Sequence, residues 1–204
     1  MTLKNAKIMK LLFHLTPLSN MESIIKNGLK PRNLLDGNEN AFIDIADPEI
    51  IDKRSCQQLG DYIPFHFHPY SAFDFAVKNS HPDIKFVYIT ITRNYARDKG
   101  FKVIPSHPLS DQAFSPILYD YETGFDMIDW EAVATSGNCD PHVKSAKMAE
   151  CLADCIIPVS SFHNVFVPDI ETEKYIKALF QAKGFTRQPP YVNIWSEVFA
   201  LNEL

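Results

Sequence analysis

The stretch LLFHLTPLSNMESIIKNGL, residues 11–29, contains a strand, a sharp break and a short helix, and it decides how the chain folds. Apolar and polar side chains alternate over residues 11–16, which predicts a β-strand with His14 and Thr16 on one face. Pro17 ends the strand because it has no amide hydrogen to donate. Such a strand suits the mouth of a cleft for a small polar ligand. The alternative is that His14 and Thr16 are ordinary strand residues.

A short helix is predicted directly after this strand. Ser19 stands three residues before Glu22, the spacing of a capping box at a helix start. Gly28 has the position of a glycine that ends a helix, and Pro31 prevents the helix from resuming. A strand backed at once by a capped helix is therefore expected.

The composition indicates one globular domain that covers residues 1–204. A chain of 204 residues with 46% apolar and 22% charged residues is long enough to bury one substantial core. It has only 7 glycines but 14 prolines, 15 phenylalanines and 8 tyrosines. This balance favours a strand-rich fold with rigid corners over a helical bundle.

Charge and cysteine content narrow the possible partners and location. The net charge is −5, so any contact with nucleic acid has to use a local basic patch. The four cysteines form no C-x-x-C pair and no secretory apolar region is recognised, which favours a reduced, cytoplasmic protein. No apolar run reaches the roughly 18 residues that a membrane span needs, so no membrane contact is expected.

Residues 33–53 are polar and rich in turn-forming residues, and a loop of this length often folds over a ligand. The alternative is that this segment is a mobile surface loop that does not contact a ligand. Ile43 and Ile45 suggest a brief strand within it. Asp47 followed by Pro48 then predicts the start of a helix that ends near Arg54.

The next segment, DYIPFHFHP at residues 61–69, predicts a strand with His66 and His68 on one face. Two histidines at this spacing could chelate a metal, but no third ligand with recognisable spacing accompanies them. We therefore expect no metal site. A metallohydrolase built on this pair remains an alternative that metal analysis would test.

Residues 84–92, IKFVYITIT, predict a strand buried on both faces inside a sheet. The basic residues that follow, Arg93, Arg97, Lys99 and Lys102, are either a solvated face or a place for nucleic-acid phosphates.

Glu150 is the most informative carboxylate in the chain. It stands between Ala149 and Cys151 in an apolar segment, where a charge is costly unless it is paired or has a function. Lys144 and Lys147 are the candidate structural partners if Glu150 has no catalytic role.

Several motifs occur in series between residues 11 and 168. They are H-L-T at 14–16 followed by N-M-E-S-I-I-x-x-G-L, Arg54 ahead of D-Y-I-P-F-x-F-x-P at 61–69, I-D-W at 128–130, and K-M-A-E-C-L at 147–152. In this order the chain resembles the DarT family, bacterial toxins that ADP-ribosylate bases in single-stranded DNA.

The resemblance implies an α+β fold of the ADP-ribosyltransferase type, with a split, mainly antiparallel β core, short helices and a cleft for NAD⁺ as co-substrate. Carried over by position, His14, Leu15 and Thr16 line the nicotinamide and ribose end of that cleft. Arg54 matches the catalytic arginine, which also contacts NAD⁺, and Glu150 matches the catalytic glutamate. The chemistry agrees, because breaking the bond from nicotinamide to ribose develops positive charge on the ribose, which a carboxylate stabilises.

Single-stranded DNA is the partner that the resemblance implies, together with a cognate antitoxin on a separate chain that removes ADP-ribose. The sequence departs from the family at Tyr70, where an arginine is common, and at Phe13, where a tyrosine is frequent. These departures leave open whether thymidine or guanosine is modified. ADP-ribosylation of RNA or protein, and a catalytically idle module that binds NAD⁺ or nucleic acid, are the alternatives.

Overall fold

The computed structural model describes residues 3–35, 42–43, 45–109, 115–137 and 140–200. Within these ranges seven strands form one sheet in the order β4-β5-β2-β1-β3-β6-β7. The strands are β1 Leu11–Pro17, β2 Ile63–His66, β3 Phe86–Thr92, β4 Lys102–Ile104, β5 Glu150–Ala153, β6 Asn164–Val167 and β7 Tyr191–Ile194. Every neighbouring pair is antiparallel except β6 and β7, which are parallel. The expected α+β class with a mainly antiparallel core is confirmed.

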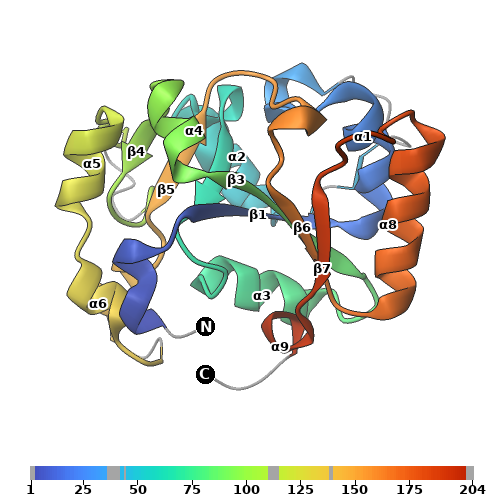
Figure 1. The fold of residues 1–204 in the computed structure, drawn as a ribbon. Helices are drawn as coiled ribbons and strands as arrows, with labels where there is room; N and C mark the ends of the chain where they lie inside the picture. The colour runs from blue at the N-terminus through green and yellow to red at the C-terminus, as the bar shows by residue number, and fades with distance from the viewer. Residues whose placement is uncertain (1–2, 36–41, 44, 110–114, 138–139, 201–204) are drawn as a thin grey trace.

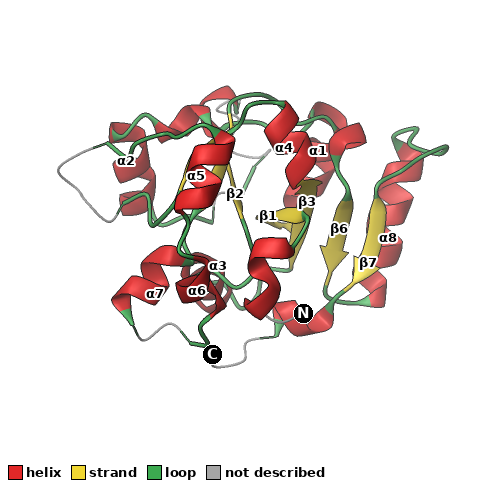
Figure 2. Ribbon diagram, turned by 60° about the vertical axis from the view of Figure 1, so that its left-hand side comes forward, coloured by secondary structure: helices red, strands yellow, loops and turns green. Residues whose placement is uncertain are grey.

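Short helices connect and cover these strands. The α-helices are α1 Met21–Asn27, α2 Pro48–Cys56, α3 Ala72–Ser80, α4 Arg93–Asp98, α5 Tyr121–Met127, α6 Trp130–Ala134, α7 Pro141–Ala146, α8 Ile170–Ala182 and α9 Ser196–Phe199. The 3₁₀ helices are η1 Leu3–Ile8, η2 Leu18–Asn20, η3 Arg32–Leu34, η4 Leu59–Asp61 and η5 Val159–Ser161. Helix α3 lies on one side of β1 and β3, and α4 lies on the other side (Figure 1). Helix α8 packs along β7 at one end of the molecule (Figure 2), and α5 lies at the opposite end (Figure 1).

The sheet is split between β1 and β2. Among the described residues these two strands pair at one position, Phe13 with His66, whereas β1 pairs with β3 along its whole length. His66 in turn pairs with Glu150 of β5. The register therefore fixes Glu150 two strands away from β1, and the separation of β1 from β2 opens space between them.

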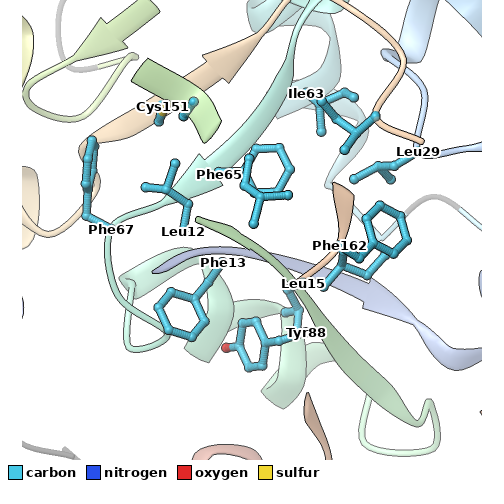
Figure 3. Close-up of a cluster of buried hydrophobic side chains, with 14 of the residues drawn as sticks. Leu12, Phe13, Leu15, Leu29, Ile63, Phe65, Phe67, Tyr88, Cys151 and Phe162 are labelled. Atoms are coloured by element: carbon cyan, nitrogen blue, oxygen red, sulfur yellow. The ribbon is translucent and has the colours of Figure 1, made fainter. Parts of the chain in front are cut away.

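The core follows from the alternation along β1. Leu12 and Phe65 lie on one side of this strand, and Phe13 and Tyr88 lie on the other (Figure 3). All four side chains are at most 1% exposed. The rings of Phe13 and Tyr88 meet edge to face, with 6.1 Å between their centroids, a favourable aromatic geometry.

The helix starts show where local sequence rules succeed. Asp47 accepts a hydrogen bond from a backbone amide of α2, as predicted, and Asp129, Asp140 and Asp169 do the same for the helices that they precede. None of the described helices is long and apolar enough to cross a membrane.

Two local predictions are wrong. Ser19 lies inside the 3₁₀ turn η2, and α1 begins after Asn20 with no side-chain cap, because the Asn20 side chain is used elsewhere. Its amide group donates to the carbonyl of Ile43 and accepts from the amide of Ile43. Ile43 and Ile45 are not in a strand. The backbone amide and carbonyl of Ile43 bond to the side chain of Asn20, so they are not available to pair with a strand. Residues 36–41 and 44 of the expected ligand-covering loop lie outside the described residues.

Gly28 ends α1 as predicted. Its φ of 80° is in the left-handed region, and its amide donates to the carbonyl of Ile24. A Cβ here would meet the Ile156 side chain at 2.7 Å, so glycine also allows the close approach of the segment that pairs Leu29 with Ile157.

Candidate active site

A cavity of about 220 Å³ lies beside the split in the sheet. Its walls include residues of β1, β2, α2, α3 and η4, the first residue of β5, and the segments 29–35 and 107–109. Phe42, Ile45 and Ala46 of the expected ligand-covering loop also line it. All five sequence-predicted site residues contribute to this wall, and they are His14, Leu15, Thr16, Arg54 and Glu150. The fold thus brings together residues from three elements that are up to 136 positions apart in the sequence.

Arg54 and Glu150 form a direct ion pair on the cavity wall. Arg54 lies in the last turn of α2, and its Nη1 is 2.9 Å and 3.0 Å from the two carboxylate oxygens of Glu150. The Glu150 side chain is 4% exposed and that of Arg54 is 16% exposed. Lys147, one of the two candidate structural partners of Glu150, instead donates to the carbonyl of Gly137.

The second guanidinium nitrogen of Arg54, Nη2, is buried and has no hydrogen-bond acceptor within the described part of the chain. Arginine presents five donors in a rigid fork that suits phosphate or carbonyl oxygens. Arg54 can therefore hold Glu150 with one nitrogen and an acceptor on a ligand with the other.

His14 is held as a neutral acceptor at the cavity. Its Nδ1 donates to the carbonyl of Pro64 at 2.9 Å, since a carbonyl can only accept. Burial lowers the pKa of His14 below its ordinary value, so the ring is neutral at pH 7 and Nε2 carries a lone pair. The hydroxyl of Thr16, two residues on, accepts from Asn20 at 3.3 Å.

His107 is a cavity residue that the sequence did not reveal. Its Nδ1 accepts from the amide of Leu109 at 2.9 Å, which leaves the hydrogen on Nε2 as a donor. Burial lowers its pKa, and the nearby charge of Glu150 acts in the opposite direction. His107 stands between Pro105 and Pro108, in a stretch where no periodicity marks a site.

His68 cannot act as a metal ligand. Its Nε2 donates to the carbonyl of Lys147 at 3.1 Å, and its Nδ1 accepts from the amide of Tyr70 at 3.1 Å. Both ring nitrogens are therefore occupied by the backbone. Among the described residues no three histidine, cysteine or acidic side chains gather around a point where a metal could bind. His68 is therefore a structural residue, whereas His66 lines the cavity.

The burial of His68 makes stability depend on pH. Burial, followed by the charges of His66 and Lys147, lowers the pKa of His68 from 6.5 to about 3. Between these values the unfolded chain binds a proton that the folded chain does not, so the free energy of unfolding falls as pH decreases. We expect a loss of about 1.4 kcal/mol per pH unit below pH 6.5 from this residue, and His14 adds to it in the same direction.

Urea unfolding at pH 7.5, 6.0 and 5.0 measures this dependence, with His68→Gln as the comparison. The variant is expected to be less stable at pH 7.5 but to lose less of its stability on acidification. An equal slope in the two proteins would show that His68 does not titrate in this way.

The basic cluster proposed for phosphates does not act as a unit. Arg93 is buried, and its guanidinium donates to the carbonyls of Ala6, Lys7 and Phe67 at 2.9 to 3.0 Å. The alternative of a phosphate contact is therefore wrong for Arg93, which stabilises the fold. Arg97 is half exposed and pairs with Glu122.

Comparisons with known proteins agree with this architecture. Residues 13–200 match the family model described as ssDNA thymidine ADP-ribosyltransferase, DarT. Among curated protein sequences none matches the chain. The solved structure of Thermus sp. 2.9 DarT in complex with ADP-ribosylated ssDNA is similar, with a TM-score of 0.78, 18% identity, and coverage of 94% of this chain and 96% of the other.

Two further solved structures share the fold. Thermus sp. 2.9 DarT in complex with NAD⁺ gives a TM-score of 0.72 at 17% identity, covering 94% of this chain and 98% of the other. Thermosipho africanus DarTG in complex with ADP-ribose gives 0.72 at 16% identity, covering 94% of this chain but 51% of the other. These likenesses establish the ADP-ribosyltransferase fold, and the family model covers nearly the whole chain. The chain therefore belongs to the DarT family, the NAD⁺-dependent ADP-ribosyltransferases that modify single-stranded DNA.

Proposed function

We propose that this chain transfers ADP-ribose from NAD⁺ to thymidine in single-stranded DNA and releases nicotinamide. The observation that carries the proposal is the Arg54–Glu150 pair in the wall of a cavity, with one guanidinium nitrogen left without a described partner. Membership of a family described by thymidine transfer supports thymidine over guanosine as the acceptor.

Glu150 is the proposed catalytic carboxylate. Cleavage of the bond between nicotinamide and ribose leaves positive charge on the ribose, and a fixed negative charge stabilises that state most where water is excluded. Glu150 is nearly buried and is held by two hydrogen bonds, so it needs little reorganisation as the charge develops. The same carboxylate can accept a hydrogen bond from a ribose hydroxyl.

Arg54 is the proposed second catalytic residue. Its Nη1 orients Glu150, and its Nη2 can donate to a phosphate oxygen of NAD⁺ or to a carbonyl oxygen of the acceptor base. Donation to the base carbonyl stabilises the negative charge that appears when the base loses its proton. The Arg54–Glu150 pair thus acts both in cleavage of the bond between nicotinamide and ribose and in activation of the acceptor base.

His14, Leu15 and Thr16 are the proposed binding residues for NAD⁺. The Nε2 lone pair of His14 can accept from a hydroxyl or an amide of the ligand, because Nδ1 is already used by Pro64. Leu15 and Thr16 follow it along β1 and line the same cavity.

The wider setting is also part of the proposal. The described elements form or pack on one sheet, which supports a single domain over residues 1–204. A cytoplasmic location would give the protein both NAD⁺ and DNA. A cognate antitoxin that removes ADP-ribose would limit its toxicity, and the chain spans about half of the Thermosipho africanus DarTG protein that it resembles.

Mass spectrometry of reacted oligonucleotides tests the proposal. The protein is incubated with NAD⁺ and single strands that contain either one thymidine or one guanosine in otherwise identical sequence. We expect one added ADP-ribose on the thymidine strand, and much less on the same strand in a duplex, where the base is stacked and paired.

Matched RNA and a protein extract serve as competing acceptors in the same assay. Labelling of guanosine would show that guanosine, and not thymidine, is the acceptor base. Labelling of RNA or protein alone would show that DNA is not the acceptor. Binding of NAD⁺ with no nicotinamide release under any condition would identify an idle binding module.

A further inference from the structure

A second carboxylate, Asp74 of α3, lies at the cavity and is not explained by the reaction described above. Its side chain is 1% exposed, and both of its oxygens lack a hydrogen-bond partner among the described residues. Asp74 is also one of the residues that line the cavity. A buried carboxylate without donors costs several kcal/mol of solvation, which natural proteins tolerate mainly at functional sites.

The polar groups around Asp74 are committed elsewhere. The hydroxyl of Tyr88 lies beside the carboxylate, and burial, followed by the charge of Asp74 and its closeness as an acceptor, raises the pKa of this phenol. Its single proton is donated to the carbonyl of Pro69 at 2.9 Å. The interaction with Asp74 is the weaker one, because it does not have the geometry of a hydrogen bond. Lys78, one turn further along α3, donates to the carbonyl of Val198 at 2.7 Å; its charge acts on Asp74 at a distance but forms no hydrogen bond with the carboxylate. Ser71 accepts from the amide of Asp74 and so caps the helix without reaching the carboxylate.

The missing partner of Asp74 is therefore a donor or a positive charge that arrives with a ligand. The parts of NAD⁺ differ in charge: the adenosine is neutral, the pyrophosphate is negative, and the nicotinamide ring is positive and carries an amide donor. A fixed carboxylate repels the pyrophosphate and attracts the ring. Phe73, the preceding residue, also lines the cavity and offers a flat apolar surface beside the same position.

We propose that Asp74 recognises the positively charged nicotinamide end of NAD⁺ and so distinguishes this co-substrate from ADP-ribose and from released nicotinamide. The inference rests on the proposed function, in which NAD⁺ is the donor. When the bond from nicotinamide to ribose breaks, its electron pair goes to the ring nitrogen and the ring becomes neutral. The attraction to Asp74 is then lost, which favours the departure of nicotinamide. Asp74 therefore raises the affinity of the protein for NAD⁺ but does not stabilise the transition state.

Binding measurements with Asp74→Asn test this inference. Asparagine keeps the shape and removes the charge. We expect the Kd for carba-NAD⁺, an analogue that keeps the positive ring, to rise about 10-fold, and the Kd for ADP-ribose to change less than about twofold. In steady state, KM for NAD⁺ should rise while kcat stays the same or increases.

Thermal unfolding supplies a second, independent readout. Because Asp74 has no described partner in the free protein, Asp74→Asn is expected to raise Tm by a few degrees. Ser71→Ala is the matched control, because it removes the cap at the start of α3 without altering the charge. This control should lower Tm and leave the ratio of the two Kd values unchanged.

Three results would overturn the assignment of Asp74: an equal loss of affinity for carba-NAD⁺ and ADP-ribose, no change for either, or a lower Tm for Asp74→Asn. Failure of the wild-type protein to modify any oligonucleotide would overturn the proposed function instead. The two Kd values are measured without DNA, so the two failures are distinguishable.

Discussion

Replacement of Glu150 by glutamine is expected to lower kcat for ADP-ribose transfer by at least about 100-fold. Glutamine has the same shape but no negative charge, so it does not stabilise the positive charge that develops on the ribose. It still accepts a hydrogen bond from Arg54, and we expect the Kd for NAD⁺ to change little. Nicotinamide release in the presence of a thymidine oligonucleotide measures kcat, and calorimetry measures binding.

The matched control for this variant is Glu131→Gln, which makes the same chemical change at an exposed position on α6. It should retain wild-type activity. If Glu150→Gln is folded and its kcat is within a few-fold of the wild-type value, the carboxylate has only a structural role as the partner of Arg54.

Replacement of Arg93 by alanine is expected to reduce the free energy of unfolding by about 3 to 5 kcal/mol. The variant leaves the carbonyls of Ala6, Lys7 and Phe67 without their donor and removes the cation from among three aromatic rings. Burial lowers the pKa of Arg93 to about 10, so the side chain is still charged at neutral pH. Urea unfolding measures the loss.

Arg97→Ala, four residues along α4, is the comparison. Arg97 is half exposed, and exposed ion pairs contribute about 1 kcal/mol or less. A similar loss of stability in both variants would mean that Arg93 acts through the helix and not through its buried contacts. A loss confined to DNA binding would restore the phosphate role that the basic cluster first suggested.

Helix starts, the alternating strand and the buried carboxylate were accessible from the sequence because each depends on neighbouring residues. An aspartate before a helix caps it through its own backbone, and alternation along β1 requires only a period of two. Ser19 and Glu22 fit the same kind of rule, yet the cap did not form. Asn20, one residue on, instead bonds to Ile43, a contact between segments that no local pattern reports.

Asp74 could have been found by the reasoning that singled out Glu150, because it too is an acid between apolar residues, here Phe73 and Phe75. The sequence does not show whether a hydrogen-bond donor for either carboxylate comes from a distant part of the chain. Glu150 meets Arg54 from a helix 96 positions away, while Asp74 meets no described donor. The two carboxylates have similar local sequence contexts and differ only in their tertiary contacts.

By itself the sequence determined the α+β class, the strand over residues 11–16, the family resemblance and the residues proposed for NAD⁺ chemistry. Only the tertiary structure decided that Arg54 pairs with Glu150, that His68 has no free nitrogen, and that Arg93 lies in the core. The physical reason is that pairing and burial are set by the register of β1, β2 and β5 and by the helices packed on them. Those long-range contacts turn His14 and Thr16 of the opening strand from plausible strand residues into part of a cavity wall.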